Sequence, residues 1–225
     1  FKLNSRDASL SLDGYYTNFE NRVIVDLYAD PGTVQVYNLY QSDPDAFSRS
    51  ITIQAEFDWS VHRRIDTRAA YRWVNSQTDF REDDLGLRLD PFIAQHRAFT
   101  QWSYASKPKE NGEQIRIDGV LQWVGPQQLP QNFIDSPHHP ITTPSFTQAN
   151  LQVTKTFKDN FEVYAGVENI FNVRHENPIV GAIATDDGPE LAPNFDNVFD
   201  ASLVYGPIFG RMTYAGLRWV VGTAN

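Results

Sequence analysis

The sequence contains no cysteine, and no segment of it is as apolar as a membrane-spanning helix. Without thiols the chain can form neither disulfides nor thiolate metal sites. A transmembrane helix needs roughly 20 consecutive apolar residues, whereas the longest uninterrupted apolar stretches, such as residues 179–184, are much shorter. Basic charge is also scarce, with a net charge of -9 at pH 7. This balance argues against a nucleic-acid partner, because phosphates require a basic surface.

Recognisable catalytic motifs and a secretion signal are missing as well. The histidines are scattered, and there is no nucleophile elbow, HExxH motif or phosphate-binding loop. We therefore expect no enzymatic activity and no cofactor. Residues 1–12, FKLNSRDASLSL, lack a charged start, an apolar core and a cleavage site. They resemble the end of one strand, a turn and the start of the next, which predicts that the chain begins partway through a longer polypeptide.

The sequence does have a strong period of two in its apolar residues. Ile51, Ile53, Ala55, Phe57 and Trp59 alternate with Thr52, Gln54, Glu56 and Asp58. Residues 161–168 and 214–221 repeat the pattern. Such alternation predicts strands with one apolar and one polar face. The first of these strands is expected to run from Leu10 through Val25.

Short and long connections alternate between the predicted strands. Short turns are expected at residues 1–5, 60–64, 107–112 and 158–160, and long connections near 29–48, 75–92, 126–144 and 172–208. A soluble sandwich would mix the two kinds. Outer-membrane barrels have short periplasmic turns and long extracellular loops in this order. The pattern predicts an all-β, antiparallel transmembrane barrel of about eight strands.

Motifs near the end of the chain carry a family resemblance. Residues 166–179, GVENIFNVRHENPI, and residues 199–219, FDASLVYGPIFGRMTYAGLRW, are similar to the last two strands of TonB-dependent outer-membrane receptors. The resemblance is greatest to the Bacteroidetes-type branch, and earlier segments such as residues 10–27 and 121–130 extend it. It implies the C-terminal part of a larger barrel of about 22 strands. The family's N-terminal plug domain has no counterpart here, so residues 1–225 are expected to form a single partial barrel domain.

The resemblance also implies a function and a location. Such receptors lie in the outer membrane of Gram-negative bacteria and import a scarce nutrient such as a ferric siderophore, cobalamin, haem or a glycan. The implied partners are outer-membrane lipid, the plug and remaining barrel strands on the same or a separate polypeptide, TonB through the plug, and the small-molecule or glycan substrate. The alternatives are a small stand-alone barrel acting as an adhesin, a structural protein or a passive pore, and a soluble β protein.

Aromatic and histidine residues in the expected external loops are the candidates for ligand contact. They are Tyr37, Tyr40, Phe80, Phe133, His138 and His139. A metal role for the histidine pair with Asp135 is the weaker interpretation, because adjacent histidines usually point apart. The acidic groups at 82–84 and 186–190 lack the spacing of a calcium loop. We therefore predict no metal site.

Opposite faces of the strands are expected to meet different surroundings. The residues predicted to face lipid are Ile51, Ile53, Phe57, Trp59, Leu121, Val153, Val163 and Leu217. Those predicted to face the lumen are Gln54, Glu56, Arg116, Glu162 and Arg218. An unpaired strand edge in lipid costs several kcal/mol for each unsatisfied backbone group. Both edges of a partial barrel would therefore require further strands.

Overall fold

The computed structural model describes residues 1–20, 22–26, 35–39, 47–80, 86–129, 142–158, 161–174, 182–185, 188–191 and 206–219. The strands are β1 (Lys2–Leu3), β2 (Arg6–Phe19), β3 (Val23–Asp26), β4 (Gln35–Asn38), β5 (Phe47–His62), β6 (Ile65–Phe80), β7 (Gly86–Leu89), β8 (His96–Ala105), β9 (Gln114–Val124), β10 (Phe146–Phe157), β11 (Phe161–Glu168), β12 (Ala182–Thr185), β13 (Gly188–Leu191) and β14 (Met212–Trp219). None of the described residues belongs to a helix long and apolar enough to cross a membrane.

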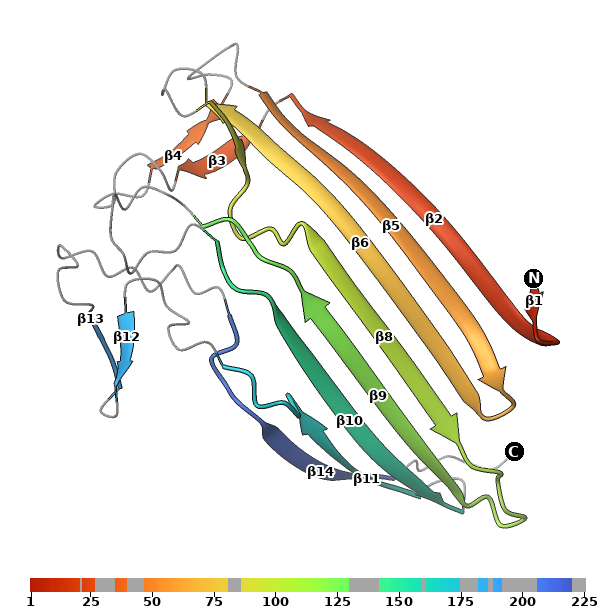
Figure 1. Cartoon of the computed structure of the whole chain (residues 1–225). Helices are drawn as coiled ribbons and strands as arrows, with labels where there is room; N and C mark the ends of the chain where they lie inside the picture. The colour runs from red at the N-terminus through yellow and green to blue at the C-terminus, as the bar shows by residue number, and fades with distance from the viewer. Residues whose placement is uncertain are drawn as a thin grey trace.

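One antiparallel sheet contains most of these strands (Figure 1). Its ten strands follow the order β1-β2-β5-β6-β8-β9-β10-β11-β14, with β7 pairing beside β6. Two separate hairpins, β3-β4 and β12-β13, lie in the long connections. Consecutive long strands are neighbours throughout, so the sheet is an up-and-down wall. The all-β, antiparallel barrel fold predicted from the sequence is confirmed in this arrangement.

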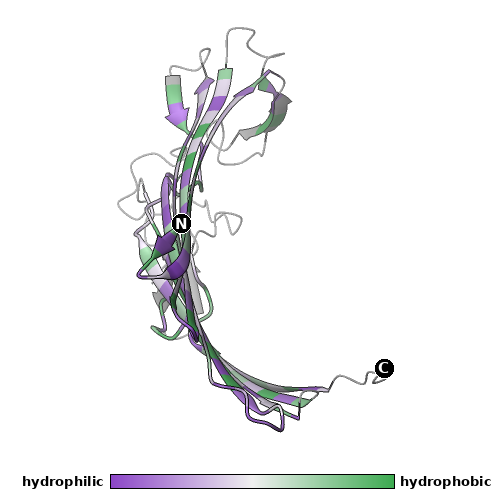
Figure 2. Ribbon diagram, turned by 90° about the vertical axis from the view of Figure 1, so that its right-hand side faces the viewer, coloured by the Kyte–Doolittle hydropathy of each residue, from purple (hydrophilic) through white to green (hydrophobic). Residues whose placement is uncertain are grey.

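The wall curves but does not close. Figure 2 shows it from the side as an arc. Within the described residues, β14 pairs with β11 alone, and β2 pairs with β1 and β5. Both edges of the sheet therefore present backbone groups that have no strand partner in the described part of the chain.

Strand register places all apolar stripes on one face of the wall. Ile53 is the cross-strand partner of Gly14 on β2 and Trp73 on β6. At the other edge Val163 is the partner of Leu217. Directly paired residues share a face in an antiparallel sheet. The eight residues predicted to face lipid consequently share one face, and the five predicted to face the lumen share the other.

Exposure differs between the two faces. On β10, Val153 of the apolar face is 41% exposed, whereas its neighbour Thr154 of the polar face is 4% exposed. On β5, Ile53 is 46% exposed and Ser48 of the polar face is fully buried. A curved sheet spreads the side chains of its convex face and crowds those of its concave face. The crowding therefore indicates that the polar face is concave and the apolar face convex.

Two expected boundaries differ from the structure. The first strand ends at Phe19, and Val23 belongs to the separate β3-β4 hairpin. The connection expected from residue 75 begins later, because β6 continues to Phe80 and β7 folds back against it. The expected turns are close to the observed ones, since β5 and β6 are separated by residues 63–64 and β10 and β11 by residues 158–160.

Candidate functional site: the polar face and its outer rim

Two of the predicted contact residues are placed by the structure, at one end of the wall or close to it. Tyr37 belongs to β4, and Phe80 is the last residue of β6. Figure 1 shows β3 and β4 close to this end of β6. The remaining candidates, Tyr40, Phe133, His138 and His139, lie outside the described residues, as does Asp135. We call the end of the wall near Phe80, from which the long connections leave, the outer rim.

The expected acidic clusters lie largely outside the structure's description. Residues 82–84 and 186–187 are not described, and Glu190 is placed only as part of β13. Within the described part of the chain, histidine and carboxylate side chains form no group that could hold a metal ion.

Ion pairs and hydrogen bonds link the polar face across its strands. Arg68 on β6 bonds to Glu56 and lies 3.7 Å from Asp58, both on β5. Arg218 on β14 pairs with Glu162 on β11 at 3.0 Å. On such a surface the pairs contribute little energy individually. Together they hold charged side chains of neighbouring strands in a polar lining along the concave side.

A polar cluster that we call the rim cluster joins two long connections to the wall. Arg22, just before β3, donates from Nη1 to Asp90 Oδ2 at 2.9 Å and to Thr78 Oγ1 at 3.1 Å, and it also bonds to Ser48. Asp90 accepts further bonds from Ser76 Oγ at 2.5 Å and from Thr78 Oγ1 at 2.7 Å. The Asp90 side chain is only 8% exposed. A buried carboxylate is tolerated here because several donors satisfy it.

Sequence reasoning did not identify the rim cluster. Arg22 and Asp90 are 68 positions apart, so no local spacing announces their contact. Arg22 also lies 5.1 Å from the Phe19 ring centroid, a cation–π distance. The available signal was one charged residue directly before a strand (Arg22) and one directly after a strand (Asp90), and such residues are common in any loop. The cluster fixes where the 20–46 and 86–95 segments leave the wall.

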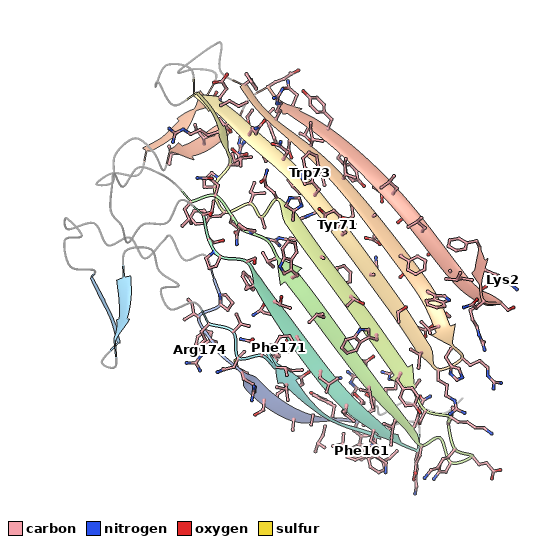
Figure 3. All side chains as sticks on the ribbon, viewed as in Figure 1. Lys2, Tyr71, Trp73, Phe161, Phe171 and Arg174 are labelled. Carbon is pink, nitrogen blue, oxygen red and sulfur yellow. The ribbon has the colours of Figure 1, made fainter. Side chains whose placement is uncertain are left out.

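The ENIFN motif forms a hydrogen-bonded turn at the rim end of β11. Asn169 accepts from Val173 N at 3.0 Å and donates from Nδ2 to Val173 O at 2.9 Å and to Phe209 O at 3.2 Å. Asn172 Oδ1 accepts from Arg211 N at 2.9 Å, just before β14. Both asparagines have positive φ, which Asn tolerates better than most residues. Figure 3 shows Phe171 and Arg174 at this end, far from Phe161. The motif therefore fixes the two ends of the 173–210 connection.

Small residues on the polar face accommodate aromatic rings. A Cβ at Gly166 would lie 2.3 Å from Tyr214 Cζ, and a Cβ at Gly216 would lie 2.3 Å from the Tyr164 hydroxyl. Tyr214 also donates to Gln152 Oε1 at 2.9 Å, across β11. Each ring thus covers the backbone of the neighbouring strand, an arrangement that helps hold register in designed sheets. These glycines serve close packing between β11 and β14.

Aromatic residues form two belts on the apolar face. The outer belt lies toward the outer rim and consists of Tyr16, Trp73 and Trp123. Tyr71, which is hydrogen-bonded to His96 Nδ1 at 2.6 Å, lies beside Trp73 of this belt (Figure 3). The inner belt lies toward the short turns and consists of Trp59, Tyr104, Phe157, Phe161 and Trp219. Aromatic belts above and below an apolar band are typical of membrane barrels, where they lie at the two lipid–water interfaces.

The short turns at the opposite end are polar. Lys109 Nζ hydrogen-bonds Glu113 Oε2 at 2.9 Å, and this bond lowers the pKa of the Glu113 carboxyl below its usual value. Lys155, on the apolar face, lies 4.6 Å from the Phe157 ring centroid near this end. A lysine at the edge of an apolar band can extend its ammonium toward the interface.

Comparison with known proteins gives a consistent result. Residues 1–170 match the family model described as "TonB dependent receptor-like, beta-barrel". No curated protein matches the sequence significantly. Among solved structures, the ferric-catecholate import receptor Fiu from E. coli K12, in its closed form, superposes with a TM-score of 0.55 at 12% identity. The match covers 96% of this chain and 26% of that receptor. At this identity the likeness concerns the fold alone.

Proposed function

The chain belongs to the TonB-dependent receptor-like β-barrel family, and from this membership we propose that it forms part of the barrel wall of an outer-membrane nutrient importer. In this proposal residues 1–225 are a single partial barrel domain from the C-terminal end of the receptor. The strands that complete the barrel, the plug and the TonB-binding segment come from other parts of the same polypeptide or from a partner. The substrate is a scarce compound such as a ferric siderophore, cobalamin, haem or a glycan.

The observation that carries the proposal is the separation of the two faces. Exposed apolar side chains cover the convex side from β2 to β14, including Leu12, Ile53, Val153 and Leu217. Soluble monomers rarely expose one contiguous apolar surface of this extent. The concave side carries the ion pairs Arg68–Glu56 and Arg218–Glu162. An apolar convex side suits contact with lipid, and a polar concave side suits a water-filled lumen.

The open edges favour a larger barrel over a small closed one. Within the described residues, the outer backbone groups of β14, and those of β2 beyond its short pairing with β1, have no strand partner. Such groups cost several kcal/mol each in lipid. Other strands of the receptor would satisfy them and continue the wall at its present curvature, since barrel diameter grows with strand number.

Uptake measurements in the source bacterium test the proposal. Cells lacking the gene are expected to lose high-affinity uptake of one of the named nutrient classes. An uncoupler that collapses the proton gradient is expected to abolish the same uptake in wild-type cells. Uptake that continues in uncoupled cells would instead identify a passive pore. An unchanged uptake profile for all four classes after gene deletion would contradict the proposal.

The loop candidates are tested on the same receptor. His138→Ala and His139→Ala are expected to weaken substrate binding to intact cells while leaving receptor abundance in the outer membrane unchanged. Ser136→Ala, in the same connection, is the matched control and should bind normally. Binding unchanged in both histidine variants would remove this pair from the site.

A further inference from the structure

Two arginines on the polar face stand directly opposite each other without a carboxylate between them. Arg72 on β6 is the cross-strand partner of Arg97 on β8. Like charges on directly opposed residues destabilise a sheet. Among the described residues, neither guanidinium takes part in an ion pair, and the Arg97 Nε–H is buried without a hydrogen-bond partner. A buried, unsatisfied donor on a charged group is costly.

Nearby carboxylates are already engaged elsewhere. Glu56 bonds to Arg68 and accepts from Gln54 Nε2 at 2.6 Å. Asp58 also lies beside Arg68, and Asp118, which accepts from Ser103 Oγ at 2.5 Å, is six residues along β9 from Val124, the cross-strand partner of Arg97. The positive charge of Arg72 and Arg97 is therefore not compensated by the wall itself.

A depression of about 350 Å³ opens over the two arginines on the concave side. Its polar lining comes from Gln54, Arg72, Arg97 and Gln122, and Phe99 and Val120 add an apolar floor. Arg72 and Trp73 are consecutive on β6, so the depression lies near the level of the outer aromatic belt. A group entering the lumen from the outer rim would reach it before the middle of the wall.

We propose that Arg72 and Arg97 form a binding site for one oxyanion group, a carboxylate or a phosphate, presented from the lumen. Guanidinium groups present planar arrays of N–H donors that match two oxygens of such a group. One oxyanion between the two arginines would attract both and offset their mutual repulsion. It would also accept a hydrogen bond from the Arg97 Nε–H, which has no partner among the described residues. The glutamines would supply additional neutral donors. Assignment of this face to the lumen rests on the proposed function.

Two sources can supply the oxyanion. It can belong to a soluble ligand that enters from outside, or to an aspartate or glutamate of the polypeptide that fills the lumen. The experiment measures the urea midpoint of unfolding of the full receptor in lipid vesicles, with sodium phosphate and sodium citrate as probes at constant ionic strength. Wild type is compared with Arg72→Gln, Arg97→Gln and Arg68→Gln. The last is the matched control, because it removes one positive charge from the same face of the same strand, where carboxylates already compensate it.

A soluble source predicts a midpoint that rises saturably with the probe in wild type and in Arg68→Gln. The probe concentration that gives half of the full rise should be at least tenfold higher in Arg72→Gln and Arg97→Gln than in wild type. A lumenal carboxylate instead predicts no response to the probes, together with a lower midpoint in both glutamine variants that recovers toward wild type in high salt. The proposal is overturned if the probes have no effect and both variants are as stable as wild type or more stable, since the arginines would then only repel each other. Folding stability is measured without transport, so failure of this proposal is separate from failure of the proposed import function.

Discussion

A lysine scan along β5 tests which face of the wall meets lipid. Ala55 lies on the apolar face, four residues from Trp59 of the inner belt and opposite Tyr71. At about 3.3 Å per residue this is ~13 Å along the strand, or ~10 Å of depth at a tilt of about 40°. The apolar band of such barrels is about 25 Å tall. Ala55 is therefore close to its middle.

The expected cost depends on depth and on face. Ala55→Lys should lower the free energy of unfolding by about 2–4 kcal/mol, and Ile51→Lys, beside Tyr16 of the outer belt, by about 0–1 kcal/mol. Gln54→Lys is the matched control on the opposite face. Its ammonium can bond Glu56, which already accepts from Gln54 at 2.6 Å. Repulsion from Arg72, the cross-strand partner of Gln54, adds a small cost, so the expected loss of unfolding free energy is less than about 1 kcal/mol.

Urea titration of the receptor in lipid vesicles measures these differences. Each variant is compared with wild type for its midpoint and for the slope of the transition, so that a change in compactness is recognised. Equal losses at Ala55 and Gln54 would refute the face assignment. A cost at Ile51 as large as that at Ala55 would refute the depth assignment while leaving the face intact.

Three further outcomes follow from particular contacts. Gly166→Ala should lower the free energy of unfolding by about 1–3 kcal/mol, because the new Cβ would overpack against Tyr214. Gly14→Ala is the control and should not lower the urea midpoint, since no atom lies within 4 Å of its new Cβ. Similar midpoints for the two variants would contradict the close packing at Gly166. Asp90→Asn should remove the negative charge that Arg22 faces and lower the free energy of unfolding by about 1.5–3 kcal/mol in the same titration. An unchanged midpoint would mean that the rim cluster contributes nothing to folding stability. In the cysteine-free chain, Ser136→Cys should react with an impermeant thiol reagent on intact cells and Lys109→Cys only after the outer membrane is opened; the reverse would invert the topology.

The wall was predictable from the sequence wherever its faces meet different media. Between the two aromatic belts each strand has one apolar and one polar side, so alternation such as Ile51 to Trp59 records both the strand and its orientation. The short turns were predictable for a related reason. Antiparallel neighbours require only a few residues between them, and polar, glycine-containing stretches such as residues 107–112 interrupt the pattern at the right places.

Prediction failed above the outer belt, where both faces of a strand can meet water. Residues 74–80, VNSQTDF, carry polar side chains on both parities and so resemble a loop, yet they continue β6. Their backbone groups pair with the start of β5, where Asp79 is the partner of Phe47. Residues 23–26 show the converse error. Alternation there is real, but the partner is β4 and not the wall. Period alone reports exposure on two sides of a strand and does not report which strand lies beside it.

The rim cluster shows why the outer rim is harder to predict from the sequence than the wall. Each wall strand has an apolar and a polar side, and the different surroundings of the two sides impose a repeating alternation on its residues. Arg22 and Asp90 are constrained by each other and by Ser76 and Thr78, and a single constellation does not repeat. Tyr37 lies in one of the segments that this cluster joins to the wall, and Phe80 is the last residue of β6 in the wall itself. The attachment of the segment that carries Tyr37 therefore depends on a contact between residues 68 positions apart, which only the folded wall brings together.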